Sequence, residues 1–162
     1  MPKQMRRPST AIKTDRQAVI LFADLMNSSL FSDTLGLYEY DDFVDKYQLT
    51  MQKAAQLVFS LRDVSQEDGT IEISIRGDEA CIILYSGNIE EDILTAILLA
   101  CCMKVMWLQS SFNLGRLGDG KIASDIGIGI HTGKVIIRPR LARANDARAE
   151  GYAINLAKRI EG

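Results

Sequence analysis

The sequence has no long hydrophobic run, no excess of charge of either sign and no cluster of cysteine and histidine. No apolar stretch approaches the roughly 20 residues that a membrane-spanning helix needs. A formal net charge of -2 argues against binding nucleic acid through bulk positive charge. The N-terminal Met-Pro-Lys-Gln-Met-Arg-Arg lacks the apolar core of a signal peptide. These absences predict a cytoplasmic protein that has neither a membrane nor a nucleic acid as its partner.

Cysteine is scarce, and its number is odd. Cys81, Cys101 and Cys102 lie in apolar segments and do not have the spacing of metal ligands. This pattern predicts reduced core residues rather than disulfides or a zinc site.

The residues that are present suffice for one hydrophobic core. A chain of 162 residues that is 47% hydrophobic can fold as a single globular domain. Residues 1–16 are polar and basic and contain two of the three prolines, which predicts a flexible N-terminal arm. The domain is then expected over residues 17–162.

Hydrophobic periodicity predicts the order of the elements. The expected elements are a strand over 17–25, a helix over 39–63, a strand, turn and strand over 69–87, a helix over 88–112, a hairpin over 124–140 and a helix from Tyr152. One seam of the second helix is expected to follow Ile89, Ile93, Ile97, Ala100 and Lys104, with Trp107 as a core residue. This order is typical of an α+β fold, a ferredoxin-like or palm-type βααββαβ sheet with helices packed mainly on one face.

Two carboxylates follow or interrupt the apolar strands of this sheet. Asp24 ends the first strand, and Asp78 lies in the turn of "IRGDEACIIL". If these strands are neighbours, the two side chains face each other, and a magnesium or manganese ion can relieve their repulsion. The alternative is structural: a Gly-Asp pair between hydrophobic runs is an ordinary hairpin turn, and Asp24 a polar residue at a strand end.

The stretch "LMNSS" after Asp24 is expected to begin a helix. Backbone N–H groups at a helix start can bind phosphate oxygens, which makes Asn27, Ser28 and Ser29 candidate phosphate-binding residues. The alternative is that Ser28 or Ser29 simply caps the helix. His131 lies in the expected His-Thr-Gly turn and is interpreted as structural.

Four segments together resemble the class III adenylate/guanylate cyclase catalytic domain: "AVILFADL", "IRGDEACIIL", "IGIGIHTGKVI" and "GYAINLAKRIEG". The resemblance implies that Asp24 and Asp78 hold two divalent metal ions, Mg²⁺ or Mn²⁺, with the Leu25 carbonyl as an extra ligand. It also implies that Asn155 and Arg159 steady the reacting ribose and phosphate, and that Arg143 contacts the triphosphate.

In this family a nucleoside triphosphate becomes a 3',5'-cyclic monophosphate, and pyrophosphate leaves. The metal aspartates come from one protomer, and the asparagine and arginine from the other. Because this chain has both sets, the resemblance implies a head-to-tail homodimer with two composite active sites.

Departures from the family concern the base. Ser74 and Arg148 stand where adenylate cyclases have the lysine and aspartate that read adenine. An arginine only donates hydrogen bonds, so it suits the carbonyl oxygens of uracil or cytosine better than adenine. The chain is also broadly similar to small pyrimidine cyclases of bacterial antiphage defence, whose product activates a separate effector. UTP, followed by CTP, is therefore the expected substrate.

Other interpretations stay open at this point: an adenylate or guanylate cyclase, a non-catalytic cyclase-homology domain for dimerisation or sensing, and a diguanylate cyclase. The last is disfavoured because Arg76 replaces the first of the two glycines in its signature turn. Asn27, Ser28 and Ser29 replace the Gly-Phe-Thr that is common in the cyclase family. The family continues beyond the residue equivalent to Arg159, so the C-terminal part of the domain is expected to be missing from this chain.

Overall fold

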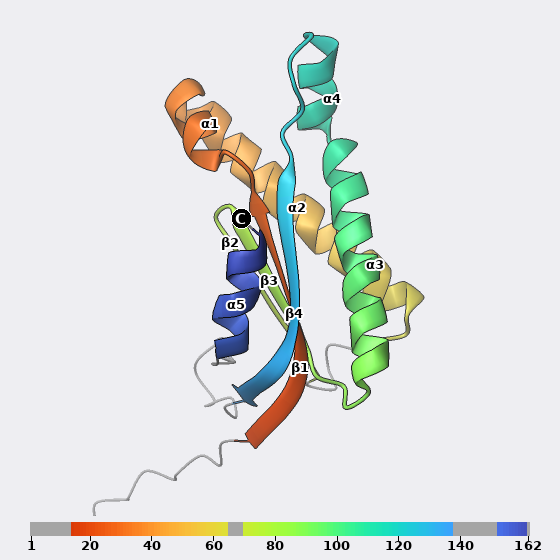
Figure 1. Ribbon diagram of the computed structural model, residues 1–162. Coiled ribbons are helices and arrows are strands. Elements are labelled where there is room, and N and C mark those ends of the chain that lie inside the picture. The colour runs from red at the N-terminus through yellow and green to blue at the C-terminus, as the bar shows by residue number, and fades with distance from the viewer. Residues whose placement is uncertain (1–13, 65–69, 138–151, 162) are drawn as a thin grey trace, which may run out of the picture.

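The computed structural model describes residues 14–64, 70–137 and 152–161 (Figure 1). The strands in this part of the chain are β1 (Thr14–Leu25), β2 (Ile71–Arg76), β3 (Glu79–Leu84) and β4 (Ile126–Ile137). The helices are α1 (Ser28–Thr34), α2 (Leu37–Leu61), α3 (Ile89–Leu108), α4 (Ser111–Gly118) and α5 (Tyr152–Glu161).

The strands form one antiparallel sheet in the order β2-β3-β1-β4. β1 lies inside the sheet and pairs with β3 along one edge and with β4 along the other. This is the order of a ferredoxin-like sheet. The predicted α+β palm-type fold is therefore confirmed.

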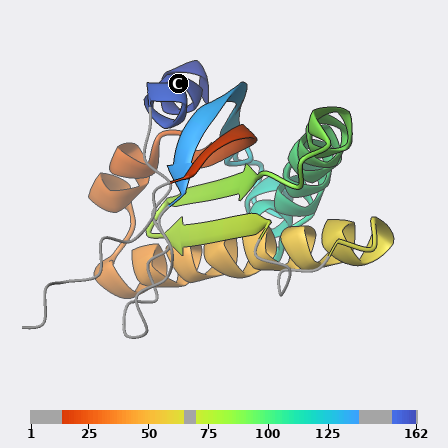
Figure 2. The same ribbon diagram turned by 90° about the horizontal axis from the view of Figure 1, so that it is seen from below.

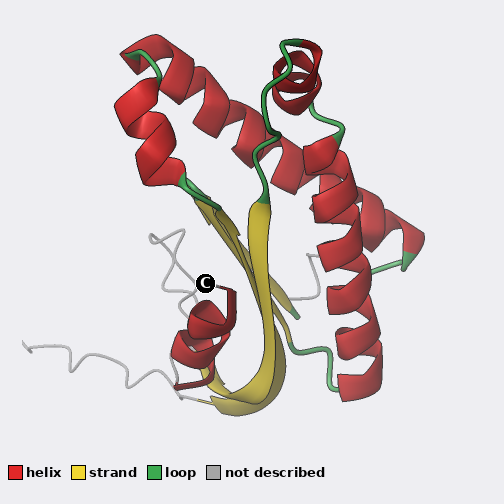
Figure 3. Ribbon diagram, turned by 45° about the horizontal axis from the view of Figure 1, so that its top comes forward, coloured by secondary structure: helices red, strands yellow, loops and turns green. Residues whose placement is uncertain are grey.

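Most of the core lies on one face of the sheet, under α2 and α3 (Figures 2 and 3). Successive side chains of a strand point to opposite faces, so alternate residues of β1 contribute to this core. They are Val19, Leu21 and Ala23, and they pack with buried residues of α2 and α3 that include Phe43, Tyr47, Met51, Leu99, Met103 and Trp107. The predicted helices "mainly on one face" are confirmed for these two.

α5 covers the opposite face. The other alternate residues of β1, Ala18, Ile20 and Phe22, form a second buried cluster with Ala153 and Ala157 of α5. The approach is close, because a Cβ atom added at Gly133 of β4 would lie 2.6 Å from the Cβ of Ala153. The absence of a side chain at Gly133 therefore allows α5 to pack closely against β4.

The hairpin predicted over 124–140 is wrong. β4 is one continuous strand from Ile126 to Ile137, and it pairs with β1 along twelve residues. His131 lies within this strand, opposite Ile20, and not in a turn. The His-Thr-Gly triplet looks like a turn locally, but the long partner strand and the helix packed on Gly133 hold it extended.

The seam predicted for the second helix is confirmed in part, because Ile89, Ile93 and Ala100 pack against the core. Ile97 is 47% exposed, and the buried residues of α3 are Asp92, Thr95, Ala96, Leu99, Met103 and Trp107. The apolar residues of α3 lie on nearly all sides, so their spacing did not define a single buried face. The helix ends at Leu108, and a separate helix, α4, follows it.

The cysteines and the N-terminus differ in detail from the expectation. All three thiols are free, as predicted, but Cys101 is exposed rather than in the core. Residues Thr14 to Arg16 belong to β1 and pair with β4, so the expectation of a flexible arm is wrong for these three residues. The rest of the expected arm, residues 1–13, lies outside the described part.

No single helix in the described ranges is long and apolar enough to cross a membrane. Taken together, α3 and α4 reach the length and apolar composition of a membrane span, but they are bent by 44° where they join.

Candidate active site

Asp24 and Asp78 lie at the same end of the sheet, as the sequence predicted. Asp24 is the second-last residue of β1 and pairs with Glu79, the first residue of β3. The N–H of Leu25 donates to the backbone carbonyl of Asp78 at 3.0 Å. The turn between β2 and β3 is thereby fixed against the end of β1.

Side chains of α2 hold both segments in place. The Tyr47 hydroxyl is buried and donates to the carbonyl of Ala23 at 2.7 Å, and Gln48 Nε2 donates to the carbonyl of Gly77 at 3.1 Å. Gly77 has a φ of 57°, which glycine adopts without strain. The sequence assigned no role at this site to Tyr47 or Gln48, because no local pattern links them to the distant Ala23 and Gly77.

The end of the sheet where Asp24, Asp78 and Glu79 lie, called the acidic end below, has an excess of negative charge. Burial, followed by repulsion from Asp78 and Glu79, raises the pKa of the Asp24 carboxyl above 3.8, against smaller opposing effects of Lys158 and the Leu25 N–H. Burial and then the charge of Asp78 likewise raise the pKa of the Tyr40 hydroxyl. The repulsive part of both shifts, which comes from the neighbouring carboxylates, would be relieved by a bound cation.

The loop after β1 shapes a pocket beside Asp24. Asn27 adopts the left-handed conformation, with a φ of 61°, which asparagine tolerates better than most residues. α1 begins at the next residue, as predicted, and the Ser28 hydroxyl donates to Asp78 Oδ2 at 2.6 Å. The pocket has a volume of about 310 Å³ and is lined by Asp24, Leu25, Met26, Asn27, Ser28, Ser29 and Gly127.

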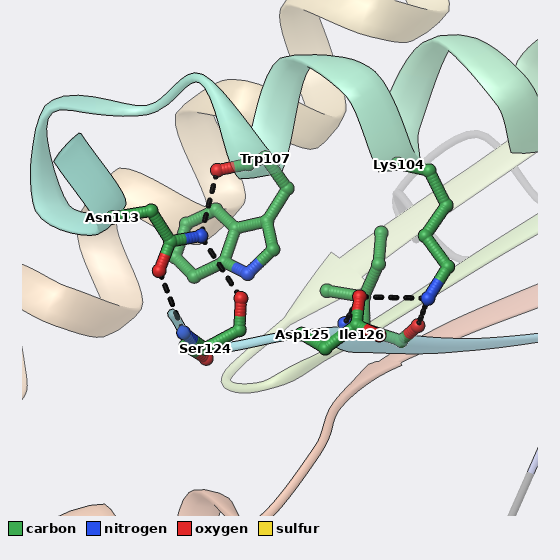
Figure 4. Close-up of polar contacts among 6 residues, drawn as sticks. All are labelled: Lys104, Trp107, Asn113, Ser124, Asp125 and Ile126. Carbon is green, nitrogen blue, oxygen red and sulfur yellow. Dashed lines mark hydrogen bonds and ion pairs between the residues drawn. The ribbon is translucent and has the colours of Figure 1, made fainter. Parts of the chain in front are cut away.

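Side chains of α3 and α4 hold the segment that leads into β4, just before Gly127 of this pocket (Figure 4). Lys104 Nζ donates to Asp125 Oδ1 at 2.7 Å and to the carbonyl of Ile126 at 2.6 Å. Asn113 is buried, and its amide bridges the carbonyls of Trp107 and Ser124, each at 2.9 Å. The start of β4, which carries Gly127, is therefore anchored to the helices.

The donor set fits a hard divalent cation. Two half-buried carboxylates at one point of the fold are the ligands that Mg²⁺ and Mn²⁺ prefer, with water or phosphate oxygens completing the shell. Within the described ranges, no group of three or more His, Cys, Asp or Glu side chains is arranged to bind a metal by itself. The pair therefore suits an ion that is shared with a ligand, and the role of the Leu25 carbonyl stays a prediction.

Asn155 and Arg159 do not join the carboxylates of their own chain. Both are exposed on α5, whereas Ala153 and Ala157 are buried against the sheet. At about 100° per residue, Asn155 and Arg159 lie roughly 160° and 200° around the helix from Ala157. They share the outer face of α5, which points away from the sheet.

Ser74 lies on the same side of the sheet as Asp24. It is exposed on β2 opposite Cys81, which in turn pairs with Phe22 of the cluster under α5. The other predicted contacts of the nucleotide, Arg143 and Arg148, lie outside the described residues.

The fold resembles those of several solved structures. No protein-family model and no curated protein matches the sequence. The guanylyl cyclase Cya2 matches with a TM-score of 0.71 and 22% identity over 91% of this chain and 70% of that one. The adenylyl cyclase CyaB from P. aeruginosa matches with a TM-score of 0.71 and 19% identity over 93% and 73%.

A third match is the guanylate cyclase domain of RhGC from Catenaria anguillulae, in a structure that contains GTP. Its TM-score is 0.66, with 18% identity over 91% of this chain and 74% of that one. At these identities the matches establish a shared fold.

Proposed function

We propose that this chain, which has the fold of adenylyl and guanylyl cyclase catalytic domains, is a nucleotidyl cyclase. The proposed reaction converts a nucleoside triphosphate to its 3',5'-cyclic monophosphate and pyrophosphate. The observation that carries the proposal is the meeting of Asp24 and Asp78 beside a pocket at the end of the sheet.

The chain's own residues suit the binding steps of this reaction. Asp24 and Asp78 would hold two divalent ions, Mg²⁺ or Mn²⁺, and Asn27, Ser28 and Ser29 line the pocket in which the triphosphate would lie. When bound, such ions lower the pKa of a coordinated hydroxyl and neutralise phosphate charge.

No protein nucleophile is needed. The ribose 3'-oxygen would form a bond to the α-phosphorus as the bond from that phosphorus to the pyrophosphate oxygen breaks, and the hydroxyl proton would pass to water. Phosphoryl transfer of this kind depends mainly on positioning and electrostatics.

The outward face of α5 supports a composite site in a homodimer. Asn155 and Arg159 point away from their own sheet, so they would act on a nucleotide held by a second protomer. Arg159 carries a permanent charge suited to phosphate oxygens, and Asn155 can orient the ribose. Arg143 is assigned to the triphosphate by the family resemblance alone.

The proposed substrate is a pyrimidine nucleotide, with UTP preferred over CTP. Ser74 is exposed on the face that carries Asp24, in keeping with a role at the base. With Arg148 it offers donors and a hydroxyl where adenine would require an acceptor for its amine. A cyclic pyrimidine nucleotide would be a messenger for a separate effector, in a cytoplasmic antiphage role.

The test is direct. The purified protein is incubated with Mn²⁺ and each of the four ribonucleoside triphosphates, and products are identified by mass spectrometry alongside pyrophosphate release. Cyclic UMP should dominate, and Asp78→Asn should abolish it, whereas Asp119→Asn, at an exposed position after α4, should not. Dominant cyclic AMP or GMP would refute the pyrimidine assignment, and no product from any triphosphate would favour the non-catalytic homology domain.

A further inference from the structure

The carboxylates of Asp24, Asp78 and Glu79 and the ammonium group of Lys158 lie near one another at the acidic end of the sheet. Glu79 pairs directly with Asp24 across the strands, so both side chains lie on the face that α5 covers. Lys158 of α5 forms an ion pair with Glu79. Its Nζ also lies 5.9 Å from the centre of the Phe22 ring. Lys158 is thus directed back to its own sheet, unlike its neighbour Arg159.

The position of Lys158 has an electrostatic consequence. Like charges directly opposite each other on adjacent strands are destabilising, and Asp24 and Glu79 are such a pair, with Asp78 next in sequence. The ammonium group supplies a positive charge at this point. Its effect reaches Asp24 as well as Glu79, since it opposes the rise in the pKa of Asp24.

We propose that Lys158 competes with the divalent cation for this end of the sheet. Its ion pair with Glu79 and its charge beside Asp24 are incompatible with full metal occupancy. The inference rests on the proposed function, in that Asp24 and Asp78 bind the cation. The cation would be held by Asp24 and Asp78, and the ammonium group of Lys158 is paired with the neighbouring Glu79, so the two positive charges would repel each other at close range.

Cation binding therefore releases Lys158 from Glu79. A lysine can make this exchange because its charge sits on a flexible four-carbon chain, and its side chain here is 55% exposed. The released Glu79 carboxylate then adds to the negative charge around the ion. Because Lys158 also anchors α5, metal occupancy and the hold on this helix are coupled.

The first measurement is Mn²⁺ affinity, read from the electron paramagnetic resonance signal of free Mn²⁺ with the full chain and no nucleotide. Lys158→Met should lower the dissociation constant for Mn²⁺ about three- to tenfold, and Lys158→Arg should leave it within about twofold of the wild-type value. The matched control is Lys121→Met, which removes an exposed ion pair with Asp119 after α4 and should change nothing.

The second measurement is stability in urea with and without saturating Mn²⁺. Without metal, Lys158→Met should lower the midpoint, because the carboxylates lose their counter-ion. With metal the difference from wild type should shrink, and the stability regained must match the ratio of the two dissociation constants by linkage. An ordinary structural ion pair would cost the same stability in both conditions.

The outcomes separate this inference from the proposed function. If wild type binds no Mn²⁺, or if Asp78→Asn binds it equally well, the metal site itself is wrong. If Mn²⁺ binds through Asp78 but its affinity is unchanged in Lys158→Met, the competitor role is overturned and the metal site stands. Should Lys158→Met fail to fold, Lys158→Gln provides the same comparison with a polar side chain.

Discussion

The Ser28 hydroxyl donates a hydrogen bond to Oδ2 of Asp78 across 2.6 Å. It joins the first residue of α1 to the turn between β2 and β3, the two segments on either side of the proposed metal site. A hydroxyl at this position orients the carboxylate and leaves its other oxygen for a cation. The resemblance drawn from the sequence aligns Ser28 with a position where cyclases commonly have an aromatic residue, and in this structure its hydroxyl contacts Asp78.

Ser28→Ala should weaken Mn²⁺ binding by about tenfold, the lower end of the range for residues that orient metal ligands. Ser28→Thr should retain most of the affinity, because threonine keeps the hydroxyl. The readout is the Mn²⁺ concentration for half-maximal pyrophosphate release, compared with kcat at saturating metal. Ser32→Ala, which removes a hydroxyl bonded only to the backbone of α1, is the control. Equal metal dependence in Ser28→Ala and wild type would contradict the role.

Asp24 should lower stability at neutral pH when no divalent ion is present. Its folded-state pKa is raised by burial first and then by Asp78 and Glu79. Between the unfolded value of 3.8 and the raised folded value, the folded state binds more protons, so stability falls as the pH rises through this window. Below it, the carboxyl is protonated in both states and the effect vanishes.

Asp24→Asn should therefore raise the urea midpoint at pH 7 in EDTA, and the gain should disappear below about pH 4. The slope of the unfolding transition should not change. Asp119→Asn, at an exposed position, should show no comparable pH-dependent gain. A wild type more stable than Asp24→Asn at pH 7 would show that the carboxylate is better compensated than its neighbours suggest.

Mixing two inactive variants should restore activity if the site is shared between protomers. Asp78→Asn would disable the proposed metal half of the site, and Arg159→Ala would remove the proposed nucleotide contact on the exposed outer face of α5. In an equal mixture half of the dimers are mixed, and each has one intact site of two, so about a quarter of wild-type activity should return.

Pyrophosphate release after mixing and re-equilibration is the measurement. Asp24→Asn mixed with Asp78→Asn serves as the control, because both lesions fall on the same half and no intact site can form. Recovery in that control, or none in the test mixture although mixed dimers are detected, would argue against the shared site.

Gly133→Ala should destabilise the fold by about 1–3 kcal/mol, because the new methyl group would meet the Cβ of Ala153 at 2.6 Å. Gly115→Ala in α4 is the matched control: no atom lies within 4 Å of the added Cβ, so it should stabilise by about 0.5–1 kcal/mol. Urea midpoints give both values. The double variant Gly133→Ala, Ala153→Gly should recover part of the loss; failure of Gly133→Ala to destabilise would mean that α5 moves aside easily.

The meeting of Asp24 and Asp78 could be predicted because two short-range signals converge on it. The first signal is a buried strand with a carboxylate at its end, and the second is a Gly-Asp turn between apolar runs. Both are present in the structure. Their adjacency then follows from the strand order of a ferredoxin-like sheet.

Features that depend on distant packing were missed. The continuity of β4 depends on twelve residues of β1 and on Ala153, which lie far from His131 in sequence. α4 contains Gly115 and Gly118, both poor helix formers, and is supported by the Ser110 cap and the buried Asn113 amide. Lys158 and Glu79 are 79 positions apart in the sequence, and no local pattern predicts their contact.

The central place of β1 has a consequence for the order of folding. β1 pairs with β3 after about 60 further residues have been made, and this pairing already unites Asp24 with the turn that carries Asp78. Its other edge receives β4 only when Ile126–Ile137 has been synthesised. Until then one side of β1 exposes unpaired backbone groups, which other chains can engage. Such widely separated pairings slow folding relative to helical proteins of the same size. Because β3 is synthesised before β4, the proposed metal site is expected to form before the sheet is complete.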